Sequence, residues 1–182
     1  MADDRPLILS AVLDAPVQQR LDALRRAHFP AERNHLDAHV TLFHHLPGAE
    51  EGAVAEAVAE AARAPAPAVE VSGVRLLGRG VAVWLSSPPL AALRAALARQ
   101  WAPWLTPQDR GKRDLHVTVQ NKVTPAVARA TLDALRDAHP PPVSVEGLAL
   151  WRYLGGPWDL IAVARFADDA LEPASMAATP SL

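Results

Sequence analysis

The chain of 182 residues contains no cysteine. It can form neither a disulfide framework nor a thiolate zinc site, and a reducing cytoplasm is the compartment compatible with this composition. Long apolar runs are also absent, because no stretch approaches the roughly 20 residues that a transmembrane helix needs. The acidic first residues lack the basic region and apolar core of a secretory signal. We therefore expect a cytoplasmic protein with no membrane association.

Neither sign of charge dominates the sequence. The formal net charge is −2, so the chain has no general attraction for nucleic acid, and any phosphate binding must come from a local site. Aromatic residues are few, at 5%, whereas hydrophobic residues of all kinds make up 50%. That content is sufficient for one well-packed domain. Nothing in the sequence calls for an obligate protein partner, and we expect a monomer.

The sequence does contain a short string that occurs twice. Residues 39–42 read His-Val-Thr-Leu, and residues 116–119 read His-Val-Thr-Val. Apolar and polar residues alternate in both strings, which predicts two β-strands, each with one polar face. The side chains expected on these polar faces are His39, Thr41 and Phe43 in the first strand, and His116, Thr118 and Gln120 in the second.

Two such strands suit the cleavage of a phosphodiester. The reaction removes a proton from the attacking oxygen and delivers one to the leaving oxygen, on opposite sides of phosphorus. One neutral and one protonated imidazole can carry out both transfers near neutral pH. Threonine hydroxyls on the same faces can donate hydrogen bonds to the phosphate oxygens. The pattern requires no metal and no cofactor.

The remaining segments predict an α+β domain with an internal duplication, because strands and helices alternate in both halves. We expect one domain over residues 1–166, with two pseudo-symmetric lobes at about 1–86 and 87–166 that can exchange strands. A disordered tail is expected over residues 167–182. The other expected strands are 6–13, 69–77, 81–85, 143–153 and 158–166, and the expected helices are 16–27, 49–63, 88–101 and 124–139.

The doubled motif resembles the two-histidine phosphoesterase superfamily, which includes the 2′-5′ RNA ligase (LigT-like) proteins and cyclic nucleotide phosphodiesterases. The resemblance extends from Leu7 to Phe166. It includes Phe-Pro at residues 29–30, Thr-Leu-Phe-His at 41–44 and Gln-Asn-Lys at 120–122. It implies a duplicated LigT-like fold, with antiparallel sheets around a central cleft and helices outside.

The same resemblance implies roles for the motif residues. His39 and His116 are expected to be the general acid and base, and Thr41 and Thr118 the phosphate anchors. The implied activity is metal-independent hydrolysis of a 2′,3′-cyclic phosphate on a nucleotide or RNA end. Family members often carry a basic residue near the motifs, whereas two further histidines follow the first motif here. This departure argues against ligation of RNA ends.

Other side chains near the motifs are candidate substrate contacts. Phe43 and Gln120 occupy equivalent positions after the two threonines, and Lys122 continues the alternation of the second motif. Arg152 and Tyr153 precede the final turn. Three strand tryptophans can stack on a base, although such residues more often pack against helices. They are Trp84, Trp151 and Trp158.

Two alternatives invoke different functions. Histidines are concentrated in one segment, and neutral imidazoles are common metal ligands, which favours a metal-dependent hydrolase. Helical spacing brings His35 and His39 to one face, whereas strand spacing brings His39 and His45 together, so the two geometries conflict. The second alternative is a non-catalytic nucleotide-binding protein with the same cleft. The candidate metal ligands are His35, His39, His44 and His45.

Overall fold

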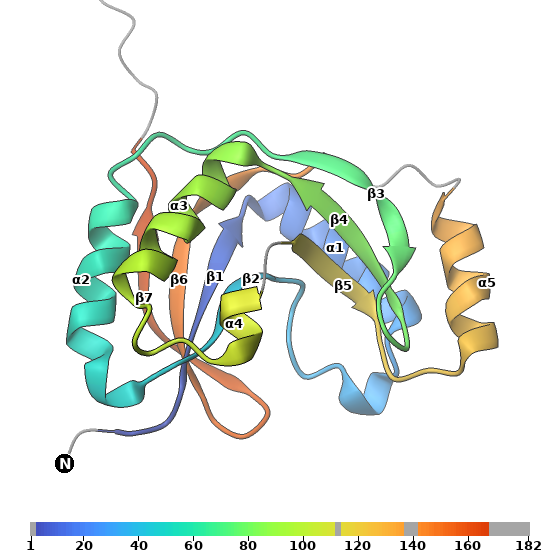
Figure 1. Cartoon of the computed structure of the whole chain (residues 1–182). Helices are drawn as coiled ribbons and strands as arrows, with labels where there is room; N and C mark the ends of the chain where they lie inside the picture. The colour runs from blue at the N-terminus through green and yellow to red at the C-terminus, as the bar shows by residue number, and fades with distance from the viewer. Residues whose placement is uncertain (1–2, 112–113, 137–141, 168–182) are drawn as a thin grey trace, which may run out of the picture.

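The computed structural model describes residues 3–111, 114–136 and 142–167. Its strands form one seven-stranded sheet in the order β3-β4-β5-β2-β1-β6-β7, in which neighbouring strands are antiparallel. Helices surround this sheet (Figure 1). The predicted α+β class is confirmed. Within the tail that was expected to be disordered, Ala167 bridges Pro65, and residues 168–182 lie outside the described residues.

The predicted strands and long helices are all present. The strands are β1 (Leu7–Leu13), β2 (Val40–Leu46), β3 (Glu70–Leu76), β4 (Val81–Ser86), β5 (Leu115–Gln120), β6 (Val145–Tyr153) and β7 (Trp158–Arg165). The α-helices are α1 (Ala15–His28), α2 (Glu51–Ala61), α3 (Pro88–Gln100), α4 (Pro107–Gly111) and α5 (Pro125–Arg136). The end of the helix expected to reach residue 139 lies outside the described residues. None of the helices in the described ranges is long and apolar enough to cross a membrane.

Sequence patterns did not predict three short elements. They are α4 and the two 3-10 helices at Ala31–Arg33 and Gly48–Glu50. Elements this short do not complete enough turns to show a hydrophobic period. Side-chain caps make two of the long helices easier to locate: the Val17 N–H donates to Asp14 at the start of α1, and the Leu90 N–H donates to Ser87 at the start of α3. Such caps satisfy backbone groups that have no partner inside the helix.

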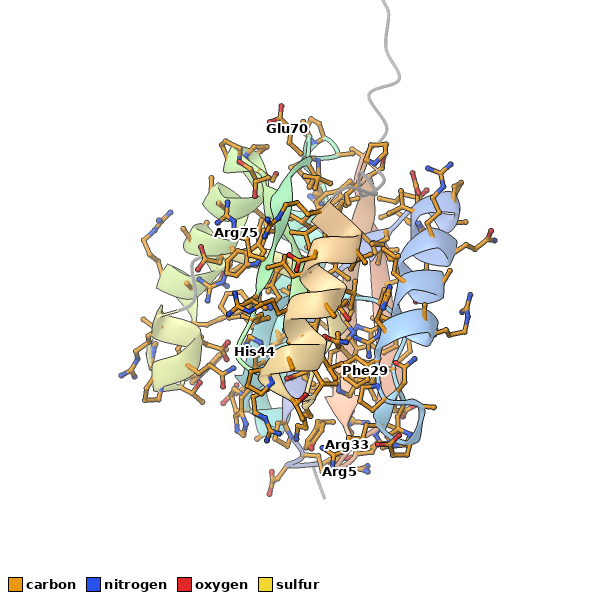
Figure 2. All side chains as sticks on the ribbon, turned by 90° about the vertical axis from the view of Figure 1, so that its right-hand side faces the viewer. Arg5, Phe29, Arg33, His44, Glu70 and Arg75 are labelled. Atoms are coloured by element: carbon orange, nitrogen blue, oxygen red, sulfur yellow. The ribbon has the colours of Figure 1, made fainter. Side chains whose placement is uncertain are left out.

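Strands from the two halves of the chain are exchanged in the sheet. Strand β4 lies beside β5 and carries β3 on its other side, and strand β6 lies beside β1 and carries β7 on its other side. Helix α1 contacts β5, α5 contacts β3 and β4, and α2 contacts β6 and β7. Seen from the side, α5 lies in front, with α3 and α4 on one flank and α1 on the other (Figure 2). The two central strands, β2 and β5, carry the two motifs, except that His39, predicted to lie in the first motif strand, directly precedes the first residue of β2.

The middle valine of each motif anchors its strand in the core. Val40 and Val117 are fully buried and belong to one continuous apolar cluster built from the sheet and the helices. Burying a valine side chain contributes about 1.5 to 3 kcal/mol. A slip of one residue in either strand would expose its valine, so burial fixes the face to which the neighbouring histidine and threonine point.

Candidate active site

The register of the two central strands sets the geometry of the candidate site. Strands β2 and β5 pair antiparallel with Val40 opposite Val117. In an antiparallel ladder the residues on either side of such a pair also face each other, on the other side of the sheet. Thr41 and His116 each neighbour this pair on their strands, while Thr118 lies on the other side of Val117 in β5 and His39 lies directly before the first residue of β2. The two motifs therefore share one face of the sheet, opposite to the buried valines.

The same face continues across the strands beside the first motif. Thr41 pairs with Ser10 of β1, Ser10 pairs with Ala149 of β6, and Ala149 pairs with Val163 of β7. A cavity of about 500 Å³ opens over Ser10, Ala149 and Val163 of this row, and of the motif histidines and threonines only His39 lines it. We call it the His39 cavity. Its lining includes Ser10, His39, Ala149, Trp151, Trp158 and Val163.

His39 has a defined tautomer. Its Nδ1 lies 2.7 Å from the Asp37 carbonyl oxygen. Because a carbonyl oxygen can only accept, Nδ1 carries the hydrogen and Nε2 keeps a lone pair. Burial lowers the pKa of His39 to about 4, against the opposing effect of the Asp37 carbonyl and with help from Arg25 and His44. The imidazole is therefore neutral near pH 7 and can accept a proton at Nε2.

Each motif histidine lies against a tryptophan. The rings of His39 and Trp158 have centroids 4.6 Å apart. Trp84 stands opposite His116 in the β4–β5 ladder, and their centroids are 5.4 Å apart. The guanidinium of Arg75 lies 5.4 Å from the Trp84 ring centroid. Both imidazoles are thus half-buried against an aromatic surface rather than surrounded by water.

A β-bulge follows each motif and overturns part of the predicted alternation. Ser10 pairs with Thr41 while the preceding Leu9 pairs with Phe43, so β2 contains one extra residue. Strand β5 contains an extra residue in the corresponding place. A bulge places two residues opposite one and reverses the alternation that follows. The prediction that Phe43 and Gln120 share a face with the motif histidines and threonines is therefore wrong.

Both side chains pack in the interior. Phe43 is fully buried, with its ring edge-on to Trp101 at a centroid distance of 5.0 Å. Gln120 is 2% exposed and donates from Nε2 to Thr131 Oγ1 of α5 at 2.8 Å. Neither side chain lines the His39 cavity. Burial in the core therefore keeps both side chains away from a substrate.

The other two predicted substrate contacts, Lys122 and Tyr153, differ in their position relative to the His39 cavity. Lys122 does not continue the alternation of β5, because the strand ends at Gln120. Lys122 is exposed in a left-handed conformation with φ of 58°. Tyr153 ends β6 directly opposite Trp158, and paired residues share a sheet face. Tyr153 is therefore next to the His39 cavity, whereas the turn separates Lys122 from the motif strand.

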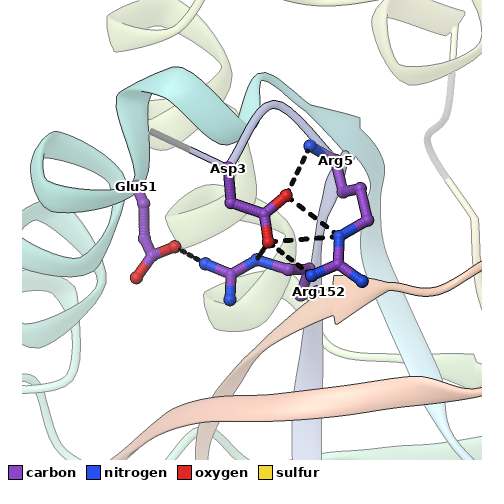
Figure 3. A network of polar contacts seen from close by, with 4 residues as sticks. All are labelled: Asp3, Arg5, Glu51 and Arg152. Atoms are coloured by element: carbon purple, nitrogen blue, oxygen red, sulfur yellow. Dashed lines mark hydrogen bonds and ion pairs between the residues drawn. The ribbon is translucent and has the colours of Figure 1, made fainter. Parts of the chain in front are cut away.

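Arg152, which neighbours Tyr153 on β6, forms ion pairs with two carboxylates outside the His39 cavity. Its Nε lies 3.1 Å from Asp3 Oδ2, and its Nη2 pairs with Glu51. Asp3 also accepts hydrogen bonds from Arg5 (Figure 3). The network joins the start of the described chain to β6 and α2. Arg152 therefore holds Asp3 and Glu51 in place, and the alternation of β6 directs Trp151 and Tyr153 to the opposite face of the strand.

Two buried arginines connect the halves of the site, and sequence reasoning missed both. Arg25 of α1 donates from Nη1 to the Thr118 carbonyl at 2.6 Å, in the second motif. Arg94 of α3 donates from Nε to the Leu42 carbonyl at 2.9 Å, in the first. Helix α1 precedes the first motif in the chain, but its arginine binds the second motif. Helix α3 precedes the second motif, but its arginine binds the first. The spacing in the sequence could have indicated that these arginines are buried, because each follows a buried leucine by four residues and so lies within the apolar stripe of its helix.

Helix α1 also holds the segment that leads to His39. Arg25 donates from Nη2 to Asn34 Oδ1 at 2.9 Å and from Nε to the Leu36 carbonyl at 3.2 Å. The Ala38 N–H donates to Asp22 Oδ1 at 2.6 Å. These contacts fix the backbone on which the His39 ring stands, before β2 begins.

Asp109 organises the two histidines that follow the first motif. Its carboxylate is fully buried and accepts the N–H groups of His44 at 2.9 Å and His45 at 3.0 Å. His44 Nδ1 lies 3.0 Å from the same carboxylate. Burial opposes ionisation of Asp109, but the hydrogen bonds from His44 and His45 outweigh it and lower the pKa. The carboxylate is therefore charged at neutral pH.

These contacts bear on the metal-dependent alternative, because they show where the two histidines after the first motif lie. The His44 ring is directed to Asp109, whereas His45 is exposed. Among the described residues no group of three or more histidine, aspartate or glutamate side chains is placed to hold a metal ion. The metal-dependent alternative therefore loses the cluster of His35, His39, His44 and His45 on which it was based.

Comparisons with known proteins identify the family and the fold. Residues 13–157 match the family model of the 2'-5' RNA ligase superfamily. No curated protein matches the sequence significantly. Among solved structures, E. coli LigT complexed with 3'-AMP is 20% identical, with a TM-score of 0.61, and the match covers 90% of this chain and 99% of that one. TT0787 of Thermus thermophilus is 18% identical, with a TM-score of 0.58 and coverage of 90% and 99%. The predicted LigT-like fold is thereby confirmed.

Proposed function

The chain belongs to the 2'-5' RNA ligase superfamily, and from this premise we propose that it is a metal-independent phosphodiesterase that opens 2′,3′-cyclic phosphates on nucleotides or RNA ends. The observation that carries the proposal is the pairing of Val40 with Val117. It brings both His-Val-Thr motifs to one face of the sheet. Solved structures of E. coli LigT complexed with 3'-AMP, with ATP and with phosphate give further support, because they hold groups of the same chemical class.

The proposed mechanism is an in-line displacement at phosphorus. His39 Nε2 takes a proton from a water molecule, whose oxygen forms a new bond to phosphorus. The bond from phosphorus to one ribose oxygen breaks, and His116 delivers a proton to that oxygen. Thr41 and Thr118 donate hydrogen bonds to the non-bridging oxygens, where charge develops. The product is a nucleoside or RNA end with one phosphate monoester and one free hydroxyl.

We expect hydrolysis of a 2′,3′-cyclic nucleotide to be unchanged in excess EDTA, because the two imidazoles carry both proton transfers and the hydroxyls hold the phosphate. The measurement is steady-state turnover of a panel of cyclic nucleotides and 2′-5′-linked dinucleotides by purified protein. Loss of turnover in EDTA and its return with zinc or manganese would contradict the proposal. Tight nucleotide binding without turnover in a single-turnover experiment would instead support the non-catalytic alternative.

The pH profile is expected to show an unusually acidic lower limb. A general base must be neutral, so kcat/KM falls as pH drops through the pKa of His39 in the free enzyme, which is about 4. An unperturbed histidine would place that limb near about 6.5. At high pH the rate falls once the general acid is no longer protonated. The measurement is kcat/KM as a function of pH, and circular dichroism at each pH confirms that the protein is folded. A lower limb near about 6.5 would show that His39 is not the general base.

A further inference from the structure

Ser10 of β1 carries a buried hydroxyl beside the candidate active site. Its side chain is 2% exposed and lines the His39 cavity. Ser10 pairs with Thr41 across the β1–β2 ladder, so the two side chains point to the same face of the sheet. Thr41 does not line the cavity, whereas Ser10 does. Among the described residues, Ser10 is therefore the hydroxyl-bearing side chain that shares the cavity with the proposed general base.

The hydrogen bond that Ser10 forms uses its oxygen but not its hydrogen. Trp151 donates from Nε1 to Ser10 Oγ at 2.8 Å. An indole N–H can only donate, so the Ser10 hydroxyl is the acceptor in this contact and keeps its own hydrogen for another partner. Among the described residues no group accepts that hydrogen. Buried polar groups are almost always hydrogen-bonded, so this donor suits an acceptor that enters the cavity.

The equivalent position in the other half of the chain has no hydroxyl. Thr118 pairs with Ala82 of β4 just as Thr41 pairs with Ser10, and a bulge follows each pair. Each half of the chain thus contributes one motif threonine, whereas only the first half adds a further hydroxyl to the same face. The repeated motif did not indicate this difference, because Ser10 lies outside both copies.

We propose that Ser10 is a further catalytic residue, which donates a hydrogen bond from Oγ to a non-bridging phosphate oxygen beside Thr41. The proposal rests on the function proposed above and adds a third hydroxyl to the two motif threonines. Charge develops on the non-bridging oxygens in the transition state, and a donor that is already fixed in a buried site stabilises this charge strongly. Trp151 is the positioning residue for this donor, because its N–H holds the Ser10 oxygen.

Ser10→Ala is expected to lower kcat/KM for adenosine 2′,3′-cyclic phosphate by about 10- to 150-fold, the range for one hydrogen bond to a charged group. Ser10→Thr keeps a hydroxyl and is expected to restore much of the rate. Thr131→Val is the matched control, because the Thr131 hydroxyl is 7% exposed and accepts from Gln120, but lies outside the cavity. We expect this control to keep the wild-type kcat/KM. A wild-type rate in Ser10→Ala would overturn the proposal.

A second variant separates loss of the phosphate contact from disturbance of Trp151. Ser10→Ala leaves the Trp151 N–H without its acceptor, whereas the double variant with Trp151→Phe removes both partners and leaves no unsatisfied donor. We expect the double variant to be at least as slow as Ser10→Ala. Trp151→Phe alone keeps the Ser10 hydroxyl and is expected to lose much less activity. Recovery of the rate in the double variant would overturn the proposal, because the loss would then come from the unpaired indole.

Sulfur substitution in the substrate tests the contact with phosphate directly. Adenosine 2′,3′-cyclic phosphorothioate has two diastereomers, each with sulfur in place of one non-bridging oxygen, and sulfur is the weaker acceptor. Ser10→Ala is expected to reduce the rate penalty for sulfur in one diastereomer and to leave the penalty in the other unchanged. Unchanged penalties in both diastereomers, or an equal change in both, would show that Ser10 does not contact one particular phosphate oxygen, which contradicts the proposal.

A failure of the proposed function is distinguishable from a failure of this inference. If the wild-type protein does not hydrolyse the cyclic phosphate, equilibrium binding of inorganic phosphate, measured by isothermal titration calorimetry, replaces turnover. Ser10→Ala is then expected to weaken phosphate binding by about 10- to 150-fold, and Thr131→Val to leave it unchanged. Equal Kd values for the wild type and Ser10→Ala would show that Ser10 does not bind phosphate.

Discussion

Replacing either motif histidine by alanine is expected to reduce kcat for a cyclic nucleotide by about 10²-fold or more, the usual scale for a lost general acid or base. His39→Ala removes the lone pair that accepts the proton of water. His116→Ala removes the group that donates a proton to the leaving oxygen, so this oxygen departs without a proton. Both variants are expected to remain folded, since each histidine is half-buried and the adjacent valines keep their places in the core. Initial rates and thermal unfolding curves measure the two effects separately.

The double variant distinguishes a pair from two independent sites. If the two histidines act in one proton-transfer step, removing the second one lowers kcat far less when the first is already absent. The loss of kcat in the double variant is then well below the product of the losses in the two single variants. His45→Ala is the matched control, because His45 is exposed and interacts with Asp109 through its backbone N–H. Loss of turnover in His45→Ala together with full turnover in His116→Ala would show that the paired-motif mechanism is wrong.

The sequence carried enough information to locate the two motif strands but not their irregularities. Val40 and Val117 alternate with polar residues, and burial of an apolar face enforces that alternation. The bulges after Thr41 and Thr118 have no local signature, because Leu42 and Val119 are also suitable for a regular strand. They follow from pairing with β1 and β4, which are distant in sequence. This is why the predicted contacts of Phe43 and Gln120 failed.

The sequence did not predict the two arginines that hold the motif strands, for a related reason. Arg25 and Thr118 are separated by 93 residues, and Arg94 and Leu42 by 52. A sequence can indicate that an arginine in an apolar helix stripe needs a partner. It does not indicate that the partner is a backbone carbonyl in the opposite motif. The exchanged strand order, which places α1 against β5, shows that each half of the chain supports the motif of the other half.

Asp109 is the clearest example of a contact that no local pattern predicts, and it has the largest expected effect on stability. It lies in α4 and binds the backbone 65 residues away, at His44. Asp109→Ala leaves the N–H groups of His44 and His45 without their acceptor. Each buried donor left unsatisfied costs about 1 to 3 kcal/mol, so we expect the free energy of unfolding to fall by about 3 kcal/mol. Urea denaturation at pH 7 measures the loss.

The pH dependence of this loss identifies the charge of Asp109 as its cause. The pKa of Asp109 is lowered in the folded protein, so the carboxylate stabilises the fold fully above its unfolded pKa of about 3.9. That contribution disappears as pH falls through the lower, folded value. Asp109→Asn keeps one acceptor oxygen without the charge, and we expect it to lose less stability than Asp109→Ala at pH 7. The gap between the wild type and Asp109→Asn is expected to narrow below pH of about 4, and a gap that stays constant with pH would assign the effect to shape rather than charge.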